Sequence, residues 1–281
     1  MDKTVLITGA TSGIGFEAAC QIAETGAHVI GLGSSQISCD TASNKMLSYG
    51  CNVDYISCDL SDQKLVGELA ENIKSRVNKL DVLINNAGVI YLKRKTDSNG
   101  IEKMFSVNYL SHYLLTRLLL NTLLDAPKAR IINVSSIAHR GVRMDFDDLS
   151  SNKSYKTMKV YGKTKLAQLL FTKYLSEKID SKKITVNAMH PGLISTNLIS
   201  KNGFLGTALT AGFKLIGKSP KKGAETIVYL ANSDSVENIS GKYFVKCKQV
   251  ELAPYAKDEI SAQMLWYKSA EMCSLPNELG V

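Results

Sequence analysis

An apolar run followed by a glycine-rich segment, close to the start of the chain, constrains the fold most strongly. Residues 4–8 (Thr-Val-Leu-Ile-Thr) show no polar alternation, which is typical of a buried parallel strand. A glycine-rich segment follows directly, and a helical pattern then runs through Thr25 to a stop at Gly26. The start of such a helix binds a pyrophosphate, because its backbone N–H groups and dipole favour an anion. The glycines stand in a Gly-x-x-x-Gly-x-Gly pattern, and a plain glycine-rich turn is the alternative to a binding loop. The predicted cofactor contacts in this segment are Gly9, Thr11, Ser12, Gly13, Ile14 and Gly15.

Six further short β-rich runs follow, with helical patterns between most of them. Strands that alternate with helices are typical of a parallel sheet that is covered on both faces. We therefore predict one α/β domain over residues 1–281, built on a doubly wound parallel sheet of about seven strands with helices on both faces. The six further strands are expected at residues 27–33, 52–57, 80–85, 130–135, 184–189 and 241–245.

Residues that follow the strands are candidate contacts, because ligands of such sheets lie at the carboxyl ends of the strands. Ser34 and Ser35 follow the second strand, where an acid would bind a ribose hydroxyl and an Arg would bind a 2′-phosphate. Serine hydroxyls can bond a phosphate, and the chain is basic. These features favour NADP(H), with NAD(H) as the alternative and a plain turn as an equally good explanation of the serines.

The third, fourth and sixth strands are followed by further candidate contacts. Asp59, next to Leu60, could accept a hydrogen bond from an adenine amino group or begin the cap of the next helix, which Ser61 and Asp62 open. Small residues would let a cofactor pack against the backbone in Asn86-Ala87-Gly88, where an Asn could also tie neighbouring loops together. Pro191 makes the chain turn sharply after the sixth strand.

Tyr161 and Lys165 are four residues apart in a helical pattern, so both side chains leave the same face of one helix. A phenol has an ordinary pKa of about 10, and a neighbouring ammonium lowers that pKa. The pair could therefore take a proton from an alcohol or give one to a carbonyl. Ser136 follows the fifth strand at the same sheet edge. Asn108 lies in a helical region expected over residues 100–124, where a structural Asn bonded to a backbone carbonyl is the simpler explanation.

Charge and cysteine usage exclude several classes of function. Lys and Arg give a formal net charge of +8 but are scattered, so we expect a solvated basic surface and no nucleic-acid partner. The six cysteines form no C-x-x-C pair, which predicts reduced thiols of an intracellular protein and no metal site. His112 has no ligand partner at metal spacing and is expected to be structural. No signal peptide is expected, and no run approaches the roughly 18 apolar residues of a membrane span.

Residues 198–222 combine apolar side chains and lysines without an acidic residue. This composition predicts a lid over a lipophilic substrate. A peripheral contact with an anionic membrane and a helix pair packed on the domain edge are the alternatives.

Over nearly its whole length the chain resembles the short-chain dehydrogenase/reductases, a family with a Rossmann-type fold. The resemblance rests on motifs in the family's order: Thr8-Gly-Ala-Thr-Ser-Gly-Ile-Gly15, Asn85-Asn-Ala-Gly88, Asn108, Ser136, Tyr161-Gly-Lys-Thr-Lys165 and Pro191-Gly192. Within that family, Asn133-Val-Ser-Ser-Ile-Ala-His139 and Ser240-Gly-Lys-Tyr-Phe244 are similar to the retinol dehydrogenase-like branch.

The resemblance implies an NAD(P)-dependent oxidoreductase that interconverts an alcohol and an aldehyde or ketone, with a retinoid-like or other lipophilic substrate. Tyr161 would be the acid/base, and Lys165 would lower its pKa and hold the nicotinamide ribose. Ser136 would hydrogen-bond the substrate oxygen, and Asn108 would support Lys165 through a water. Further cofactor contacts are expected at Pro191, Gly192, Ile194 and Thr196.

Members of the branch usually carry an Arg at the position of Ser34 and an N-terminal membrane anchor, and this sequence has neither. We therefore expect a cytoplasmic protein, soluble or peripheral to a membrane. A homodimer through the helices around Asn108 and Tyr161 is a further expectation from the family. The alternative function is a catalytically silent scaffold or sensor that keeps the cofactor-binding fold.

Overall fold

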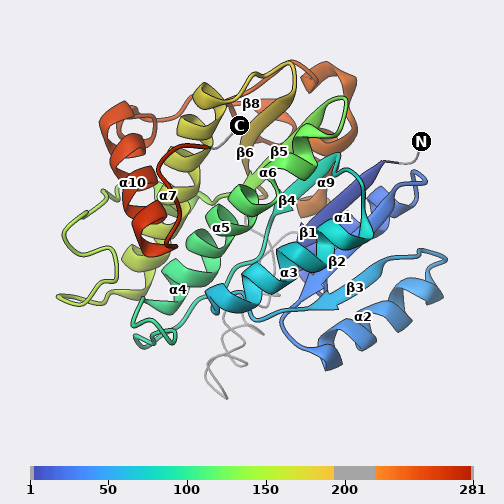
Figure 1. Ribbon diagram of the computed structural model, residues 1–281, viewed down its shortest axis with the longest axis horizontal. Coiled ribbons are helices and arrows are strands. Elements are labelled where there is room, and N and C mark those ends of the chain that lie inside the picture. The colour runs from blue at the N-terminus through green and yellow to red at the C-terminus, as the bar shows by residue number, and fades with distance from the viewer. Residues whose placement is uncertain (1–2, 193–218, 280–281) are drawn as a thin grey trace.

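The computed structural model describes residues 3–192 and 219–279, which form an α/β structure around an eight-stranded sheet (Figure 1). The strand order is β3-β2-β1-β4-β5-β6-β7-β8, and neighbouring strands from β3 to β7 are parallel. The order reverses between β1 and β4, which is the point where doubly wound sheets bind ligands. The strands are β1 (Thr4–Thr8), β2 (His28–Gly33), β3 (Asp54–Ser57), β4 (Val82–Asn85), β5 (Ala129–Val134), β6 (Ile184–His190), β7 (Tyr243–Val245) and β8 (Lys248–Gln249).

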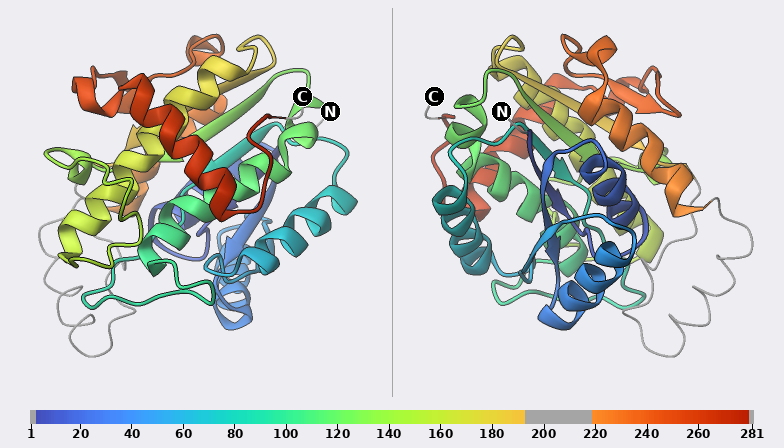
Figure 2. Two further views of the ribbon diagram at one scale, coloured as in Figure 1. Left: turned by 60° about the vertical axis from the view of Figure 1, so that its left-hand side comes forward. Right: turned by 90° about the vertical axis from the view of Figure 1, so that its right-hand side faces the viewer.

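Helices cover both faces of the sheet (Figure 2). One face is covered by α3 (Gln63–Arg76), α4 (Lys103–Phe105), α5 (Ser111–Leu118), α6 (Leu120–Leu124), α7 (Thr157–Lys178) and α10 (Glu259–Met272). The other face is covered by α1 (Gly13–Ala23), α2 (Gln36–Ser48) and α9 (Pro220–Asn232). Each face buries its own apolar cluster, because β1, β4 and β5 send alternate side chains to opposite sides of the sheet.

The predicted sheet is confirmed, with one strand more than expected. The chain turns back after β7 through Lys246 and Cys247, whose φ angles are 51° and 60°. Positive φ at both central residues is the geometry of a two-residue hairpin, and it places β8 antiparallel to β7. Helix α2 was not predicted either. It buries only Cys39, Ala42 and Met46, so its sequence shows little apolar periodicity.

The helical region expected over residues 100–124 begins at Lys103 and contains a π-helical turn, Ser106–Leu110. Such turns occur frequently at functional sites. Asn108 lies within this turn and is fully buried.

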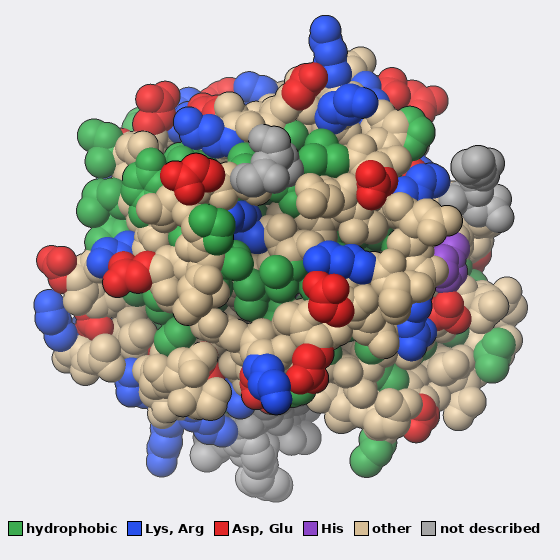
Figure 3. All heavy atoms as spheres, in the orientation of Figure 1, with side chains coloured by type: hydrophobic (Ala, Val, Ile, Leu, Met, Phe, Trp, Pro, Cys, Tyr) green, Lys and Arg blue, Asp and Glu red, His purple; other side chains and the backbone are tan. Residues whose placement is uncertain are grey.

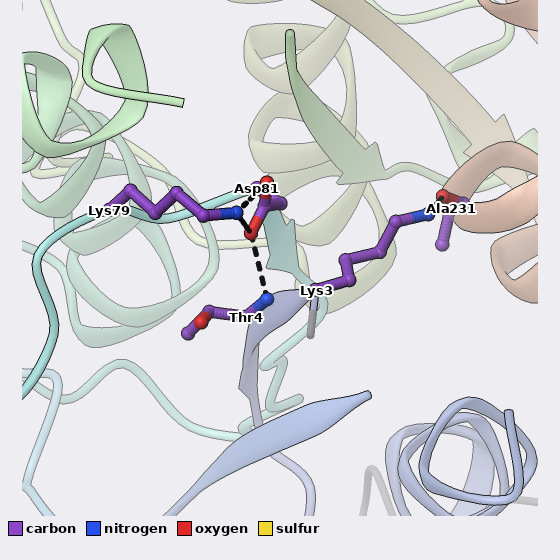
Figure 4. Close-up of polar contacts among 5 residues, drawn as sticks. All are labelled: Lys3, Thr4, Lys79, Asp81 and Ala231. Atoms are coloured by element: carbon purple, nitrogen blue, oxygen red, sulfur yellow. Dashed lines mark hydrogen bonds and ion pairs between the residues drawn. The ribbon is translucent and has the colours of Figure 1, made fainter. Parts of the chain in front are cut away.

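Polar contacts hold the amino ends of β1 and β4 together, at the sheet edge opposite to the carboxyl ends (Figure 4). Asp81 accepts a hydrogen bond from the Thr4 backbone N–H at 2.8 Å, and the Lys79 ammonium lies 2.6 Å and 2.7 Å from its two oxygens. Lys3 donates to the carbonyl of Ala231, which lies in α9. These contacts attach β1 to its sheet neighbour and to a covering helix.

Basic and acidic side chains are interspersed on the face shown in Figure 3, rather than gathered in one basic patch. Among the described residues, no helix has the length and apolar character needed to cross a membrane. Of the predicted lid at 198–222, residues 198–218 lie outside the described residues, and Pro220 begins α9.

Candidate active site

The glycine segment forms a tight turn between β1 and α1. Gly9 and Gly13 have φ angles of +68° and +57°, where residues with a side chain are strained. A Cβ on Gly15 would lie 2.3 Å from the Gly9 carbonyl oxygen. Ser12 is the N-cap residue of α1, but its side chain makes no capping hydrogen bond, so it does not compete for the first N–H groups of the helix. This arrangement fits the pyrophosphate of a dinucleotide.

Asn86 ties the glycine turn to the end of β4. Its side-chain Nδ2 donates to the carbonyls of Thr8 and Gly9 at 2.8 Å and 3.2 Å. The Thr8 hydroxyl in turn accepts hydrogen bonds from the backbone N–H groups of Asn86 and Ala87, both at 2.8 Å. The carboxyl ends of β1 and β4 are thereby fixed together at the point where the strand order reverses.

The structure places Ser34 at the exposed end of β2 and Asp59 and Leu60 after β3. Asp59 accepts hydrogen bonds from the backbone N–H and the hydroxyl of Ser61, at 2.9 Å and 2.8 Å. The N-cap of α3 is Asp62, whose carboxylate accepts from the N–H groups of Lys64 and Leu65. Asp59 therefore holds the turn that precedes the cap, and it stays a candidate contact for an adenine.

Tyr161 and Lys165 lie on α7, and both are buried. The Tyr161 hydroxyl lies close enough to Ser136, which follows β5, for Ser136 to lower the Tyr161 pKa. The Lys165 ammonium donates to the Val134 carbonyl at 2.8 Å and lies 5.7 Å from the centre of the Tyr161 ring. The three residues predicted at the centre of the site are therefore neighbours.

Burial decides the pKa values of this pair. Burial raises the pKa of Tyr161 to about 12, and the neighbouring Ser136 side chain opposes this only partly. The pKa of Lys165 is lowered by burial to about 8. The loss of water outweighs any lowering by the Lys165 ammonium, which was the expected effect. Tyr161 is therefore protonated at neutral pH.

Gly162 brings α7 close to the segment after β5, a role that the sequence analysis missed. A Cβ at this position would lie 2.5 Å from the Ala138 carbonyl oxygen and 2.7 Å from the Val142 side chain. Only a glycine allows this approach, which places Tyr161 beside Ser136. A glycine inside a helix, directly after the candidate tyrosine, was the available signal.

The side chain of Asn108 bonds both the segment after Gly88 and Thr164 of α7. Its Oδ1 accepts from the Val89 N–H at 2.7 Å, and its Nδ2 donates to the Val89 carbonyl at 2.9 Å. The Asn108 carbonyl accepts a hydrogen bond from Gln168 Nε2 at 2.7 Å. These contacts fix Asn108 in place. They link the loop after β4 to α7.

Gln168 and His112 extend this link to β1. His112 Nε2 lies 3.1 Å from the Thr8 hydroxyl, and His112 Nδ1 lies 2.6 Å from Gln168 Nε2. Burial lowers the pKa of His112 to about 3, so the ring is neutral at neutral pH. His112 was expected to be structural, whereas the role of Gln168 was not predicted. Its signal was a single amide inside the apolar run of residues 166–171.

The remaining predicted contacts follow β6. Gly192 has a φ of +94°, which places the sharp turn after Pro191 at this residue. Ile194 and Thr196 lie outside the described residues. A surface hollow of about 540 Å³ lies elsewhere, along α10 and the segment after it, and is lined by none of the predicted site residues.

Comparisons with known proteins agree with this geometry. The family model for short chain dehydrogenases matches residues 3–203. Human retinol dehydrogenase 13 is 39% identical over 97% of this chain and 85% of its own length. Human polyprenol dehydrogenase is 33% identical over 96% of this chain and 85% of its own length.

A solved structure from Mycobacterium paratuberculosis, described as a putative uncharacterized protein, superposes with a TM-score of 0.79 at 28% identity. The match covers 98% of this chain and 95% of that one. Fold, site motifs and relatives thus lead to one conclusion: the chain belongs to the short-chain dehydrogenase/reductase family, and within it is similar to the retinol dehydrogenases.

Proposed function

We propose that this protein interconverts a lipophilic alcohol and its aldehyde or ketone, with NADP(H) as the preferred cofactor. The family supports an NAD(P)-dependent oxidoreductase acting on alcohols and carbonyls. The single observation that carries the proposal is that Tyr161 and Ser136 are neighbours at the carboxyl edge of the sheet. Lys165 lies beside this pair, at the sheet edge where the glycine turn begins α1.

Residues at the carboxyl edge would hold the cofactor. The turn from Gly9 to Gly15 would hold the pyrophosphate, Ser34 and Asp59 the adenosine side, and Asn86 to Gly88 the middle of the cofactor. Lys165 would bind the nicotinamide ribose. A nicotinamide dinucleotide supplies the hydride for the substrate carbon in reduction and accepts it in oxidation.

The protein's own residues would position the substrate oxygen and move its proton. Ser136 would hydrogen-bond that oxygen. Tyr161 would give its proton to the oxygen of a carbonyl and take a proton from an alcohol. A pKa of about 12 for Tyr161 keeps this proton on the phenol at neutral pH, which is the form that can protonate a carbonyl oxygen. With a pKa of about 8, Lys165 is mostly charged at pH 7 and would stabilise a tyrosinate that forms during turnover.

Three observations support the finer assignments. The relatives are named for retinol and polyprenol, which are lipophilic alcohols. No acidic residue stands at the end of β2, where Ser34 and Ser35 occupy the positions that would face the adenosine ribose. The net charge of +8 also favours a cofactor with an additional phosphate.

The test is a panel of lipophilic and small polar aldehydes, ketones and alcohols, assayed separately with NADPH/NADP and NADH/NAD. We expect reduction of lipophilic aldehydes, with kcat/KM at least tenfold higher for NADPH than for NADH. A Ser34→Asp variant should lose this preference, whereas Ser48→Asp at the far end of α2 serves as the matched control. Cofactor binding without turnover of any substrate would instead identify a silent scaffold.

A further inference from the structure

A pair of cysteines lies away from the candidate active site, between α1 and the turn that precedes β3. The Sγ atoms of Cys20 and Cys51 are 2.7 Å apart, and both residues are buried. Two unbonded sulfur atoms ordinarily stay farther apart than this, whereas a disulfide bond is about 2.05 Å long. The two side chains therefore already point at each other at a separation close to that of a bond.

The backbone around the pair is held independently of the sulfur atoms. Cys51 follows α2, and its N–H donates to the Met46 carbonyl at 3.0 Å. Phe16, one turn before Cys20 on α1, makes an edge contact with the Tyr49 ring at 6.3 Å, and the Lys45 ammonium lies over the Phe16 ring. Because α1 and the end of α2 are packed together by these residues, bond formation requires little movement.

Glu24 is the third group of this cluster. Its carboxylate lies 3.7 Å from Cys20 Sγ, and it is exposed. A metal ion held by the two thiolates and this carboxylate would be the alternative use of the cluster. A tetrahedral zinc site with Zn–S bonds of about 2.3 Å would place its sulfur atoms almost 4 Å apart. The pair would have to open by about 1 Å for a metal but close by less than that for a disulfide.

We propose that Cys20 and Cys51 form an intramolecular disulfide when the protein meets a peroxide. The Cys20 sulfur, the more exposed of the two, attacks one peroxide oxygen. The O–O bond breaks, one water leaves and Cys20 becomes a sulfenic acid. The Cys51 sulfur then attacks the Cys20 sulfur, the S–O bond breaks, and the hydroxide leaves as a second water with the Cys51 proton. Two thiols are oxidised and one hydrogen peroxide is reduced to two waters.

The surroundings of Cys20 and Cys51 also determine how fast the disulfide forms and which part of the fold it stabilises. Burial raises the pKa of Cys20 to about 12, so little thiolate is present at neutral pH and the oxidation is slow, with a rate that increases with pH. The new bond would join the middle of α1 to the chain just before β3. It would therefore stabilise the part of the fold that carries the glycine turn and Ser34.

The experiment treats the full-length protein with hydrogen peroxide, blocks remaining thiols with iodoacetamide after unfolding, and maps peptides by mass spectrometry. We expect a Cys20–Cys51 cross-linked peptide with a mass loss of 2 Da. The Tm should rise by about 5 °C or more. Cys20→Ala and Cys51→Ala should abolish the cross-link and the rise in Tm, and Cys273→Ala, a buried cysteine of the opposite face, should abolish neither.

Two results would overturn the proposal. One is full alkylation of both cysteines after peroxide treatment at pH 8.5, where the reaction is favoured. The other is stoichiometric zinc in the purified protein that is lost in Cys20→Ala, which would identify the cluster as a metal site.

Discussion

Tyr161 is the residue on which the proposed proton transfer depends. Replacing it with Phe keeps the ring in its buried position but removes the hydroxyl that lies beside Ser136. We expect Tyr161→Phe to lower kcat by about 10²- to 10⁴-fold, the usual contribution of a positioned acid/base. Binding of NADPH, measured by fluorescence titration, should change by less than about threefold, because the glycine turn is untouched.

The matched control is Tyr174→Phe, which removes a hydroxyl from the same helix. Tyr174 stacks on Trp266 of α10 and lies on the side of α7 away from Ser136. Turnover of this variant should equal that of the unmodified protein. If Tyr161→Phe also kept its turnover, Tyr161 would not be the acid/base and the proposed mechanism would have to be abandoned.

His112 predicts how the stability of the protein depends on pH. Burial lowers its pKa in the fold to about 3. In the unfolded chain the ring takes a proton near its ordinary pKa of about 6.5. The unfolded state therefore binds more protons between these values, and the free energy of unfolding falls as the pH falls from 6.5 toward 3. Neutral His190, with a pKa lowered by burial to about 4, acts in the same direction.

Urea unfolding at a series of pH values measures this effect. We expect His112→Gln to flatten the decline of stability below pH 6.5, whatever its stability at pH 7. His28→Gln, which removes an exposed histidine of β2, tests whether the loss of any histidine has this effect. An unchanged pH slope in His112→Gln would show that the fold does not lower the pKa of this ring.

At the level of elements, the approach of α7 to the segment after β5 depends on Gly162. An Ala in a helix is ordinarily about 1 kcal/mol more favourable than a Gly. Here its Cβ would lie 2.5 Å from the Ala138 carbonyl oxygen, so α7 must move away. We expect Gly162→Ala to lower the free energy of unfolding and to lower kcat by at least tenfold.

Gly67→Ala on α3 is the control. A Cβ at this position would have no neighbour within 4 Å, so the substitution should instead raise stability by about 0.5–1 kcal/mol. Gain of stability in both variants would contradict this account.

The helices and strands also show which parts of the fold could be predicted from the sequence. The parallel strands were predictable because both faces of the sheet are covered, which makes their sequences continuous apolar runs. Helix α2 was missed because one packed side leaves most of its residues polar, and β8 was missed because it has only two residues. The positions of Tyr161, Lys165 and Ser136 were predictable from motif order. The contribution of Gly162 and the protonation of Tyr161 depend on contacts between distant segments, which a single sequence does not record.

In the whole molecule, α10 covers the outer faces of α5 and α7. Trp266 is buried there, with its ring 4.8 Å from that of Tyr174 and 5.0 Å from that of Tyr113, and Arg117 lies over it. The Tyr109 hydroxyl bonds the Ser269 hydroxyl at 2.7 Å. A homodimer through the helices around Asn108 and Tyr161 would have to displace this helix. We therefore expect that this face of the protein does not form a dimer interface.

Trp266→Ala tests whether α10 holds this face closed. Removing a buried Trp leaves a cavity and should lower the free energy of unfolding by about 3–5 kcal/mol. Tyr267→Ala, the neighbouring and partly exposed residue, should cost less than about 1 kcal/mol. If α10 loosens, apolar side chains of α5 and α7 become exposed, so light scattering should detect association in Trp266→Ala but not in the control. A stable dimer of the unmodified protein that Trp266→Ala dissociates would show that α10 builds an interface rather than covering one.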